Sequence, residues 1–339
     1  MYNTIRRVKL LRLEHRSKES FIRGILKGEF RKNMKCSIII PYSAKSDKTI
    51  RLFDSLERQD FDESEYELIF VNCGNNNELE RYINEHGAKV RTVCLKAPDG
   101  KAGQAKNIGL KKAVGELVIF LSGDEITSES FVSGHYNGYK QAEKPIMQFG
   151  LTKQVFEEND RFYYEVKEII GNGIRYWLRE PERYGLDKQK NYYYIKDIRL
   201  EMLEPYSYDF DKVKYKMIFT KTSNLSVPME CIRRWGGFEE SYRGEEVEDW
   251  EFGYRMMKNN VDIVYNSQVA VLHLYEKERY DSKRFGDWKS NLDSMLKKYN
   301  DSFLNKLSEF TSYFDPEGKY DTSRNIWLDT YKHLEMGAR

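Results

Sequence analysis

The sequence predicts an α/β protein with a mostly parallel central sheet flanked by helices. Short, β-branched apolar runs alternate with helical stretches from residue 35 onward, and the links between them are short. Polar segments, two of which contain glycine, follow three of the predicted strands, at the edge where open parallel sheets bind ligands. A chain of 339 residues has room for one large catalytic domain with appendages, or for two domains.

The predicted elements begin with a strand over residues 36–41, a β-branched run that a proline ends. After it come, in order, a helix over 48–59, a strand over 66–71, a helix over 78–86, a strand over 90–95, a helix over 104–114 and a strand over 116–121. The polar segments 41–43, 72–77 and 122–125 close three of these strands. We therefore expect the functional site where these three segments meet.

The composition argues against several classes of protein. Hydrophobic residues make up 40% of the chain and charged residues 32%, and no apolar run approaches the roughly 20 residues of a membrane-spanning helix. The four cysteines lack CxxC spacing, which argues against a zinc site and a disulfide scaffold. A net charge of +2 does not indicate nucleic-acid binding. The first residues do not form a secretory signal, so we expect a cytoplasmic protein.

Residues 1–34 are predicted to form a basic amphipathic helical arm. Eleven Lys and Arg against three Glu give residues 1–35 a net charge of +8 and leave −6 for the rest of the chain. Apolar residues recur in the arm at helical spacing. Two interpretations stay open. The helix binds an anionic membrane surface, with the protein peripheral on the inner face of the membrane, or it docks on its own domain.

Two further segments stand apart from the alternating pattern. Residues 159–215 are dense in tyrosine and have no strong period, which predicts an insertion that shapes a pocket, with most of its tyrosines packed against the domain. Residues 276–339 contain helical stretches over 288–298 and 305–310, which predict a helical C-terminal extension.

Four motifs of the second half carry a family resemblance: Asn224-Leu-Ser, Gly236-Gly-Phe-Glu-Glu240, Glu248-Asp-Trp-Glu-Phe-Gly-Tyr-Arg255, and a strand that ends in His273. The series resembles the acceptor half of GT-A glycosyltransferases, most closely family 2 and the related galactosyl- and N-acetylgalactosaminyltransferases. The first half is similar to the nucleotide-binding half of these enzymes through Ser37-Ile-Ile-Ile-Pro-Tyr42, Gln104-Ala-Lys-Asn-Ile-Gly109 and Gly115-Glu-Leu-Val-Ile-Phe-Leu-Ser-Gly-Asp124. The resemblance implies a GT-A domain over 35–275, with a nucleotide-binding half (35–125) and an acceptor half (126–275).

The resemblance implies a site for a nucleotide-sugar donor at the strand ends. Its expected contacts are Pro41, Tyr42, Asn72, Lys106, Asn107, Ser122 and Gly123. Two positions depart from the family pattern. Asn72 stands where the family has an acidic residue that contacts the nucleoside, and Ser122-Gly-Asp124 stands where the family has Asp-x-Asp. The donor end is therefore atypical.

A diphosphate donor calls for a divalent cation, Mn²⁺ or Mg²⁺, because these hard ions prefer oxygen ligands and neutralise phosphate charge. By resemblance, Asp124 occupies the family's metal-binding position, and His273 a position that supplies a metal ligand in some members. Glu125 can add a ligand. The alternatives are that Asp124 and Glu125 begin a helix, whose dipole favours carboxylates there, and that His273 is a packed strand residue.

The resemblance also implies that Asp249, beside Glu248, is the base that takes the proton of the acceptor hydroxyl. Five carboxylates within residues 245–251 are expected to crowd one another, which raises pKa values and favours a base near neutral pH. The alternative is an acidic first turn of a helix with solvated side chains. The expected acceptor contacts are Trp235, Gly236, Gly237 and Trp250.

The function predicted from these motifs is an inverting, metal-dependent glycosyltransferase. It would move a sugar from a nucleotide diphosphate, a UDP-sugar in our prediction, to a hydroxyl of a glycan or lipid-linked acceptor, in the synthesis of cell-surface polysaccharide or glycoconjugate. The alternative is a catalytically weakened glycosyltransferase-like protein that binds a ligand or partner, which Asn72 and Ser122 motivate. Dehydrogenases, P-loop enzymes and nucleotidyltransferases are disfavoured because no glycine-rich phosphate loop follows the first strand.

Overall fold

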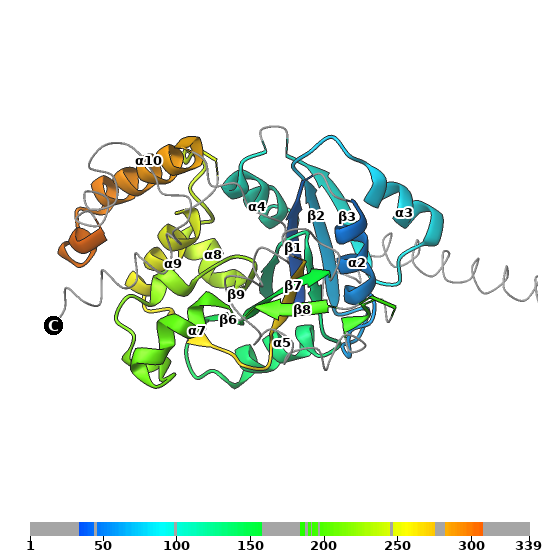
Figure 1. Ribbon diagram of the computed structural model, residues 1–339, viewed down its shortest axis with the longest axis horizontal. Coiled ribbons are helices and arrows are strands. Elements are labelled where there is room, and N and C mark those ends of the chain that lie inside the picture. Colours follow the sequence, from blue (N-terminus) through cyan, green and yellow to red (C-terminus); the bar gives the residue numbers. More distant parts are fainter. Residues whose placement is uncertain are drawn as a thin grey trace, which may run out of the picture.

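The computed structural model describes residues 34–43, 46–97, 100–157, 184–186, 189–190, 192–195, 197–244, 247–274 and 282–307. Within these residues, eleven strands form two sheets, and helices cover the larger sheet on both sides (Figure 1). The fold is therefore the α/β architecture that the alternation of elements predicts.

The larger sheet of the described chain has seven strands in the order β10-β6-β9-β4-β1-β2-β3. Their bounds are β1 Cys36–Tyr42, β2 Tyr66–Asn72, β3 Arg91–Lys96, β4 Leu117–Leu121, β6 Ile146–Phe149, β9 Asn224–Pro228 and β10 Asp262–Tyr265. β1 pairs in parallel with β2 and β4, β2 with β3, and β10 with β6. β9 runs antiparallel to both β4 and β6. The predicted, mostly parallel sheet is confirmed.

The strand register decides which segments meet at one edge of this sheet. β1 and β2 stay paired to their ends, where Tyr42 lies opposite Asn72. β9 begins where β4 ends, because Leu121 pairs with Asn224. The segment that follows β4 and the segment that precedes β9 must therefore meet, beside the carboxyl ends of β1 and β2.

Both faces of the larger sheet are buried, as expected of a parallel sheet between layers of helices. Ile39, Ile69 and Phe120 share a core with α4 (Ala102–Leu110), α8 (Met229–Trp235) and α9 (Glu248–Lys258). The neighbouring positions Ile38, Leu68 and Ile119 share a second core with α2 (Ser46–Leu56), α3 (Glu78–His86) and α5 (Phe131–Gln141). Each such side chain, fully buried, stabilises the fold by about 1.5–3 kcal/mol.

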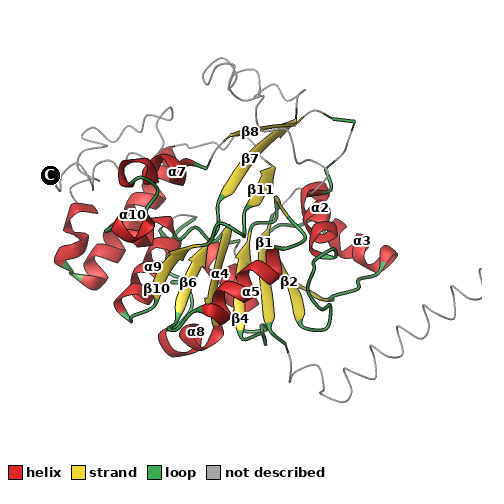
Figure 2. Cartoon of the chain, turned by 90° about the horizontal axis from the view of Figure 1, so that it is seen from below, coloured by secondary structure: helices red, strands yellow, loops and turns green. Residues whose placement is uncertain are grey.

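The smaller sheet has the order β5-β11-β7-β8 and lies beyond the ends of β1 and β4 (Figure 2). Its strands are β5 Glu125–Thr127, β7 Thr152–Glu157, β8 Tyr192–Ile195 and β11 Val271–Leu274. β5 begins four residues after β4 ends, and β11 pairs with it so that His273 lies opposite Glu125. This pairing brings β11, which comes late in the sequence, to the edge where β4 ends.

The remaining described helices are α7 Ile198–Leu203, α10 Ser282–Tyr299, and the 3₁₀ helices η4 Glu204–Tyr206, η5 Phe210–Lys212, η6 Lys216–Phe219 and η7 Ser302–Leu304. α10 confirms that the chain after residue 276 is helical where it is described. Trp288 of α10 packs edge-on against Trp250 of α9, with ring centroids 6.4 Å apart. The C-terminal extension therefore packs directly on the second half of the fold.

Several predictions concern residues outside the described part. The basic arm lies there apart from Met34, as do residues 158–183 of the tyrosine-rich segment and the tail from 308. Where that segment is described, Tyr184, Tyr192 and Tyr215 are buried, as expected, while Tyr208 is 57% exposed. No helix in the described residues is both long and apolar enough to cross a membrane.

Candidate active site

The candidate site lies at the edge where β4 ends and β9 begins. Asp124 comes three residues after β4, and Thr222 comes two residues before β9. Thr222 in turn binds Asp249, the first-turn carboxylate of α9. The predicted metal ligand and the predicted base are thus both tied to the β4–β9 pair, although 125 residues separate them in sequence.

Asp124 and His273 form a direct pair at this edge. His273 Nε2 lies 2.9 Å from Asp124 Oδ2, and His273 Nδ1 lies 2.6 Å from Gln154 Oε1. Asp124 Oδ1 is shielded from solvent and has no hydrogen-bond partner. Although burial opposes its ionisation, the hydrogen bond and charge of His273 hold the pKa of Asp124 at about 2. The carboxylate is therefore an anion at every physiological pH.

This pair fits a divalent cation. The 2.9 Å between Nε2 and Oδ2 matches the spacing of about 3.0 Å between neighbouring corners of an octahedron with bonds of about 2.1 Å. Gln154 occupies Nδ1, as the outer partners of metal-binding histidines do. No group of three or more His, Cys, Asp or Glu side chains suited to an ion occurs in the described ranges. A cation at this pair would complete its coordination with phosphate and water oxygens, as Mg²⁺ does with nucleotides.

The turn between β4 and β5 is held by its own side chains. Glu125 is fully buried, and its Oε2 accepts a 2.8 Å hydrogen bond from the backbone N–H of Ser122. The alternative in which Asp124 and Glu125 begin a helix is wrong, because Glu125 begins β5 and pairs with β11. Gly123 lies so close to Tyr42 that a Cβ would overlap it. Ser122 and Gly123 therefore shape the turn, and Glu125 is directed into it rather than toward Asp124.

The predicted nucleoside-contacting segment is also locally braced. Asn72 is 1% exposed, its Oδ1 accepts from the N–H of Gly74, and its Nδ2 donates to the carbonyl of Asn76. Pro41 is half-buried at the end of β1, and Tyr42 is buried with its ring edge-on to Phe70. The Asn72 amide thus makes its hydrogen bonds within its own loop. A contact between Asn72 and a nucleoside stays a prediction.

Asp249 is held by three donors. Lys106 Nζ and Thr222 Oγ1 each donate to Oδ1 at 2.8 Å, and the Thr222 N–H donates to Oδ2 at 3.0 Å. Lys106 also reaches Glu248 Oε1 at 2.9 Å and lies over the ring of Phe238. Burial alone would lower the pKa of Lys106, but Asp249 and Glu248 raise it above its usual 10.5. The cluster carries two anions and one cation.

This arrangement corrects two predictions. Lys106, expected at the nucleotide, instead bridges the two carboxylates of the predicted base. The expected crowd of carboxylates does not form within the described chain, because Glu251 turns toward Arg255, Lys298 and Tyr299. Residues 245 and 246 lie outside the described part. The ammonium of Lys106 therefore lies between Glu248 and Asp249, where repulsion among carboxylates was expected.

The first turn of α9, which carries Asp249, is held by close packing. Val247, directly before the helix, has φ of 72°, which is costly for a β-branched residue and is typical of positions held by surrounding structure. Within the helix, Gly253 lies against Thr220, and a Cβ there would overlap its side chain. Thr220 Oγ1 also donates to the carbonyl of Asp249 at 2.9 Å. α9 is therefore docked closely enough to fix the position of its first turn.

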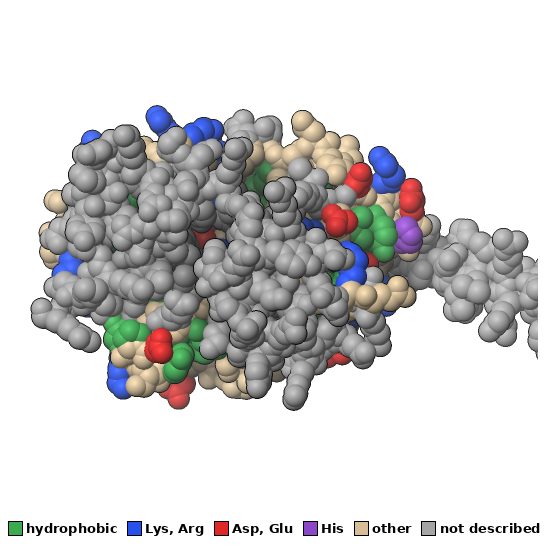
Figure 3. Space-filling view, viewed as in Figure 1, with side chains coloured by type: hydrophobic (Ala, Val, Ile, Leu, Met, Phe, Trp, Pro, Cys, Tyr) green, Lys and Arg blue, Asp and Glu red, His purple; other side chains and the backbone are tan. Residues whose placement is uncertain are grey.

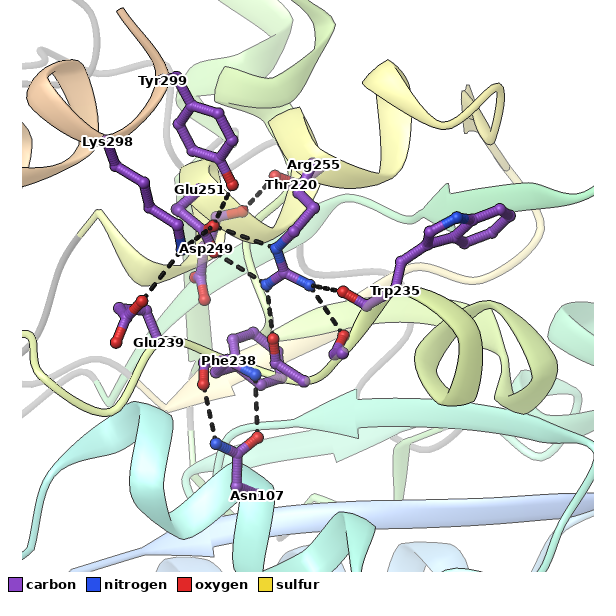
Figure 4. Close-up of polar contacts among 12 residues, drawn as sticks. Asn107, Thr220, Trp235, Phe238, Glu239, Asp249, Glu251, Arg255, Lys298 and Tyr299 are labelled. Carbon is purple, nitrogen blue, oxygen red and sulfur yellow. Dashed lines mark hydrogen bonds and ion pairs between the residues drawn. The ribbon is translucent and has the colours of Figure 1, made fainter.

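The expected acceptor residues divide into two groups. Trp250 is a core residue, 1% exposed and packed on Trp288, so its predicted contact with the acceptor is wrong for this conformation. Trp235, Gly236 and Gly237 belong to a surface loop whose three carbonyls accept hydrogen bonds from Arg255 (Figure 4). Gly236 has φ of 88°, a conformation that glycine adopts without strain.

Asn107, expected at the nucleotide, forms hydrogen bonds with the same loop. Its Nδ2 donates to the carbonyl of Phe238 at 2.8 Å, and its Oδ1 accepts from the Phe238 N–H at 2.9 Å (Figure 4). Gly237 passes so close that a Cβ would overlap this amide. Asn107 therefore joins α4 of the first half to the loop that carries the Gly236-Gly-Phe-Glu-Glu240 motif.

Three functional residues escaped the sequence analysis. Thr222 stands two residues before the Asn224-Leu-Ser motif, which signals an ordered turn there. Arg255 ends the α9 motif four residues after Glu251, a spacing that predicts an ion pair. Gln154 carries no signal in the sequence. On the part of the described surface that is visible in Figure 3, acidic and basic side chains are interspersed.

Comparisons with known proteins match the chain to glycosyltransferases. The model of the family described as glycosyl transferase family 2 matches residues 37–205. An uncharacterized glycosyltransferase, YfnE of Bacillus subtilis, is 22% identical over 317 residues, covering 89% of this chain and 79% of that protein. The poly(ribitol-phosphate) β-N-acetylglucosaminyltransferase TarP of Staphylococcus aureus is 28% identical over 155 residues, 42% of this chain and 46% of that protein.

The fold is also that of solved glycosyltransferases. A crystal structure of GalNAc-T7 with UDP, GalNAc and Mn²⁺ superposes with a TM-score of 0.57 at 12% identity, covering 89% of this chain and 54% of that one. At this identity the likeness concerns the fold. Taken with the family match over 37–205 and with the carboxylates gathered at the end of β4, it identifies the chain as a GT-A glycosyltransferase of the family 2 type.

Proposed function

We propose that the protein is a divalent-metal-dependent, inverting glycosyltransferase that moves a sugar from a UDP-sugar to an acceptor hydroxyl. The observation that carries the proposal is that two carboxylate groups are tied to the paired strands β4 and β9. The Asp124–His273 pair follows β4, and the Asp249–Lys106–Glu248 cluster is bound to Thr222, two residues before β9. The first suits a metal-bound diphosphate, and the second suits a proton acceptor.

The base assignment rests on the hydrogen bonds of Asp249. A carboxylate oxygen accepts about two hydrogen bonds. Oδ1 has two donors, Lys106 and Thr222 Oγ1, whereas Oδ2 has the Thr222 N–H. One lone-pair position on Oδ2 is thus open to the acceptor hydroxyl, and the side chain is 13% exposed. Asp249 takes the proton as the hydroxyl oxygen attacks the anomeric carbon and the nucleotide diphosphate leaves.

Asp124 and His273 would hold the cation, with Gln154 orienting the imidazole. Bound there, Mn²⁺ or Mg²⁺ neutralises negative charge on the leaving diphosphate. Asp124 is 36% exposed at its side chain, so the pair is accessible to a ligand. The Mn²⁺ and UDP in the related GalNAc-T7 structure support this choice of ion and nucleotide.

The acceptor is proposed to be a polymer of the cell surface. The name of TarP, which matches 42% of this chain, specifies transfer of N-acetylglucosamine to poly(ribitol phosphate). UDP-N-acetylglucosamine and poly(ribitol phosphate) are therefore the first donor and acceptor to test. The wider class of acceptors that we propose is a glycan or a lipid-linked molecule at the cytoplasmic face of the membrane. The basic arm would bring the protein to that face.

The experiment measures donor binding and transfer separately. Calorimetry with UDP, with and without Mn²⁺, should show binding that requires the ion. Asp249→Asn should lower kcat about 10²–10⁴-fold, the range of general base catalysis, and leave the Kd for UDP within about twofold. Asp211→Asn, at a side chain 94% exposed, is the matched control. Unchanged turnover in Asp249→Asn would remove the base assignment, and absence of UDP binding would favour a non-catalytic binding protein.

A further inference from the structure

The loop of residues 235–240 is held by one arginine. Arg255 Nη1 donates to the carbonyls of Trp235 at 2.6 Å and Gly236 at 2.9 Å, and Nη2 donates to the carbonyl of Gly237 (Figure 4). Three consecutive carbonyls converge on one guanidinium because Gly236 takes a positive φ of 88°. A lysine ammonium has three donors on one atom and cannot reproduce this fork.

Glu251 completes the coordination of Arg255 and fixes its direction. Its Oε1 accepts from Nε at 3.1 Å, and its Oε2 accepts from Nη2 at 2.9 Å. A guanidinium has five N–H donors, and these five contacts use them all. Glu251 is 0% exposed. A buried ion pair has a defined geometry, and removing one of its partners is costly in stability. Arg255 is therefore committed to the loop.

α10, in the C-terminal extension, braces the same pair. Lys298 Nζ donates to Glu251 Oε1 at 3.1 Å and to Glu239 Oε2 at 3.0 Å, and the Tyr299 hydroxyl donates to Glu251 Oε1 (Figure 4). Glu239 belongs to the loop itself. One lysine thus joins the end of α10 both to the loop and to the carboxylate that orients Arg255.

The loop is gripped on its other side by α4, through Asn107 and Phe238. It therefore lies between three helices, and one of them, α9, carries Asp249 in its first turn and Arg255 further on. A shift of the loop relative to α9 would change its distance from the proposed base. The contacts that prevent such a shift come from Arg255 and from α10.

We propose that Arg255 is a positioning residue for the acceptor, acting through the 235–240 loop, and that Lys298 makes α10 part of the acceptor site. The proposal rests on the function proposed above. Arg255 touches neither substrate nor the reacting atoms. It sets the loop against which the acceptor binds, so its loss should raise the KM for acceptor and leave donor binding unchanged.

The first test is amide hydrogen exchange of the full chain, which needs no substrate. Arg255→Lys should speed exchange of the 235–240 amides at least tenfold, and Lys298→Met should do so to a smaller extent. Amides of β1 and β4 should keep their wild-type rates, which shows that the fold is intact. Arg233→Lys, at an exposed position of α8 just before the loop, is the matched control. Loop exchange equal to that of the control would overturn the proposal.

The second test is kinetic, with UDP-N-acetylglucosamine as donor and poly(ribitol phosphate) as acceptor. Arg255→Lys should raise the acceptor KM at least tenfold, with the Kd for UDP in Mn²⁺ within about twofold of wild type. An unchanged acceptor KM, in a variant whose loop exchanges faster, would overturn the acceptor role. A wild-type chain that transfers no sugar would refute the proposed function, while the exchange measurement would still decide whether Arg255 and α10 hold the loop.

Discussion

Lys106→Met tests the most unusual electrostatic feature of the site, a single buried ammonium shared by two carboxylates. Lys106 and Glu248 are each 7% exposed at the side chain and Asp249 13%, with Nζ 2.9 and 2.8 Å from the two carboxylates. Methionine has a similar length and still packs on Phe238, so the change removes charge more than volume. Removing one partner of a buried ion pair costs about 3–5 kcal/mol, which is the loss of stability we expect at neutral pH.

The pH dependence gives the test a sign. The pKa of Lys106 is raised in the folded state, so its contribution is fully present below about 10.5 and is lost only as the pH rises through the higher folded value. Wild-type stability should therefore not vary between pH 6 and 9 on account of this group.

Urea unfolding, followed by the fluorescence of the buried Trp250 and Trp288, measures the loss of stability at pH 7.5. Lys111→Met, at an exposed position just after the same helix, is the control, and it should stay within about 0.5 kcal/mol of wild type. A loss in Lys106→Met below about 1 kcal/mol would refute the idea that this ammonium compensates two buried carboxylates.

Three other predictions follow from single contacts. Asp124→Asn should weaken UDP binding in the presence of Mn²⁺ at least tenfold in calorimetry, whereas Asp211→Asn should leave it unchanged; wild-type affinity in Asp124→Asn would separate Asp124 from the metal. Gly253→Ala, whose Cβ would overlap Thr220, should lower the free energy of unfolding in urea by about 1–3 kcal/mol. Gly286→Ala in α10, with open space around it, should raise that free energy by about 0.5–1 kcal/mol. The reverse order would contradict the docking of α9. Burial lowers the pKa of His135 from 6.5 to about 3. The stability that the neutral imidazole contributes is therefore fully present above pH 6.5 and falls by about 1.4 kcal/mol per pH unit below it. His135→Asn should lack that slope between pH 6.5 and 5, and an identical slope would show that His135 does not titrate with unfolding.

Much of the fold was predictable because its information is local. The β-branched run that forms β1, the proline near its end and the short links to the next elements each act over a few residues, and the bounds of β1, β2 and α3 follow them closely. The strand β5, which begins directly after Asp124, was not predicted. A carboxylate pair suits the start of a helix, but Glu125 begins a strand because β11, nearly 150 residues later, supplies its partner.

The site was predictable in its residue types and not in its contacts. Asp124 pairs with His273, and Asp249 binds Thr222 just before β9; the roles of these residues stay predictions. The direction of Lys106 could not be predicted, because a lysine on α4 has several neighbours within reach, and the positions of Glu248 and Asp249 depend on how α9 docks. Trp250 follows Asp249 by one residue, a turn of about 100° around the helix, which points it at Trp288 of α10 instead of at an acceptor.

The contacts of α4 give a physical reason why motifs in the two halves of the chain occur together. Lys106 and Asn107 are adjacent, yet one binds the carboxylates of α9 and the other binds the 235–240 loop. On the same helix, Gly103 passes under the carbonyl of Glu239, where a Cβ would stand 2.9 Å away, and Gly109 sits against Ile39 of β1. A larger residue at either glycine would move α4 and so displace Asp249 and the 235–240 loop together. The Gln104-Ala-Lys-Asn-Ile-Gly109 segment therefore belongs functionally to the second half of the protein, and its pairing with Glu248 and Asp249 is stronger support for a glycosyltransferase site than either motif alone.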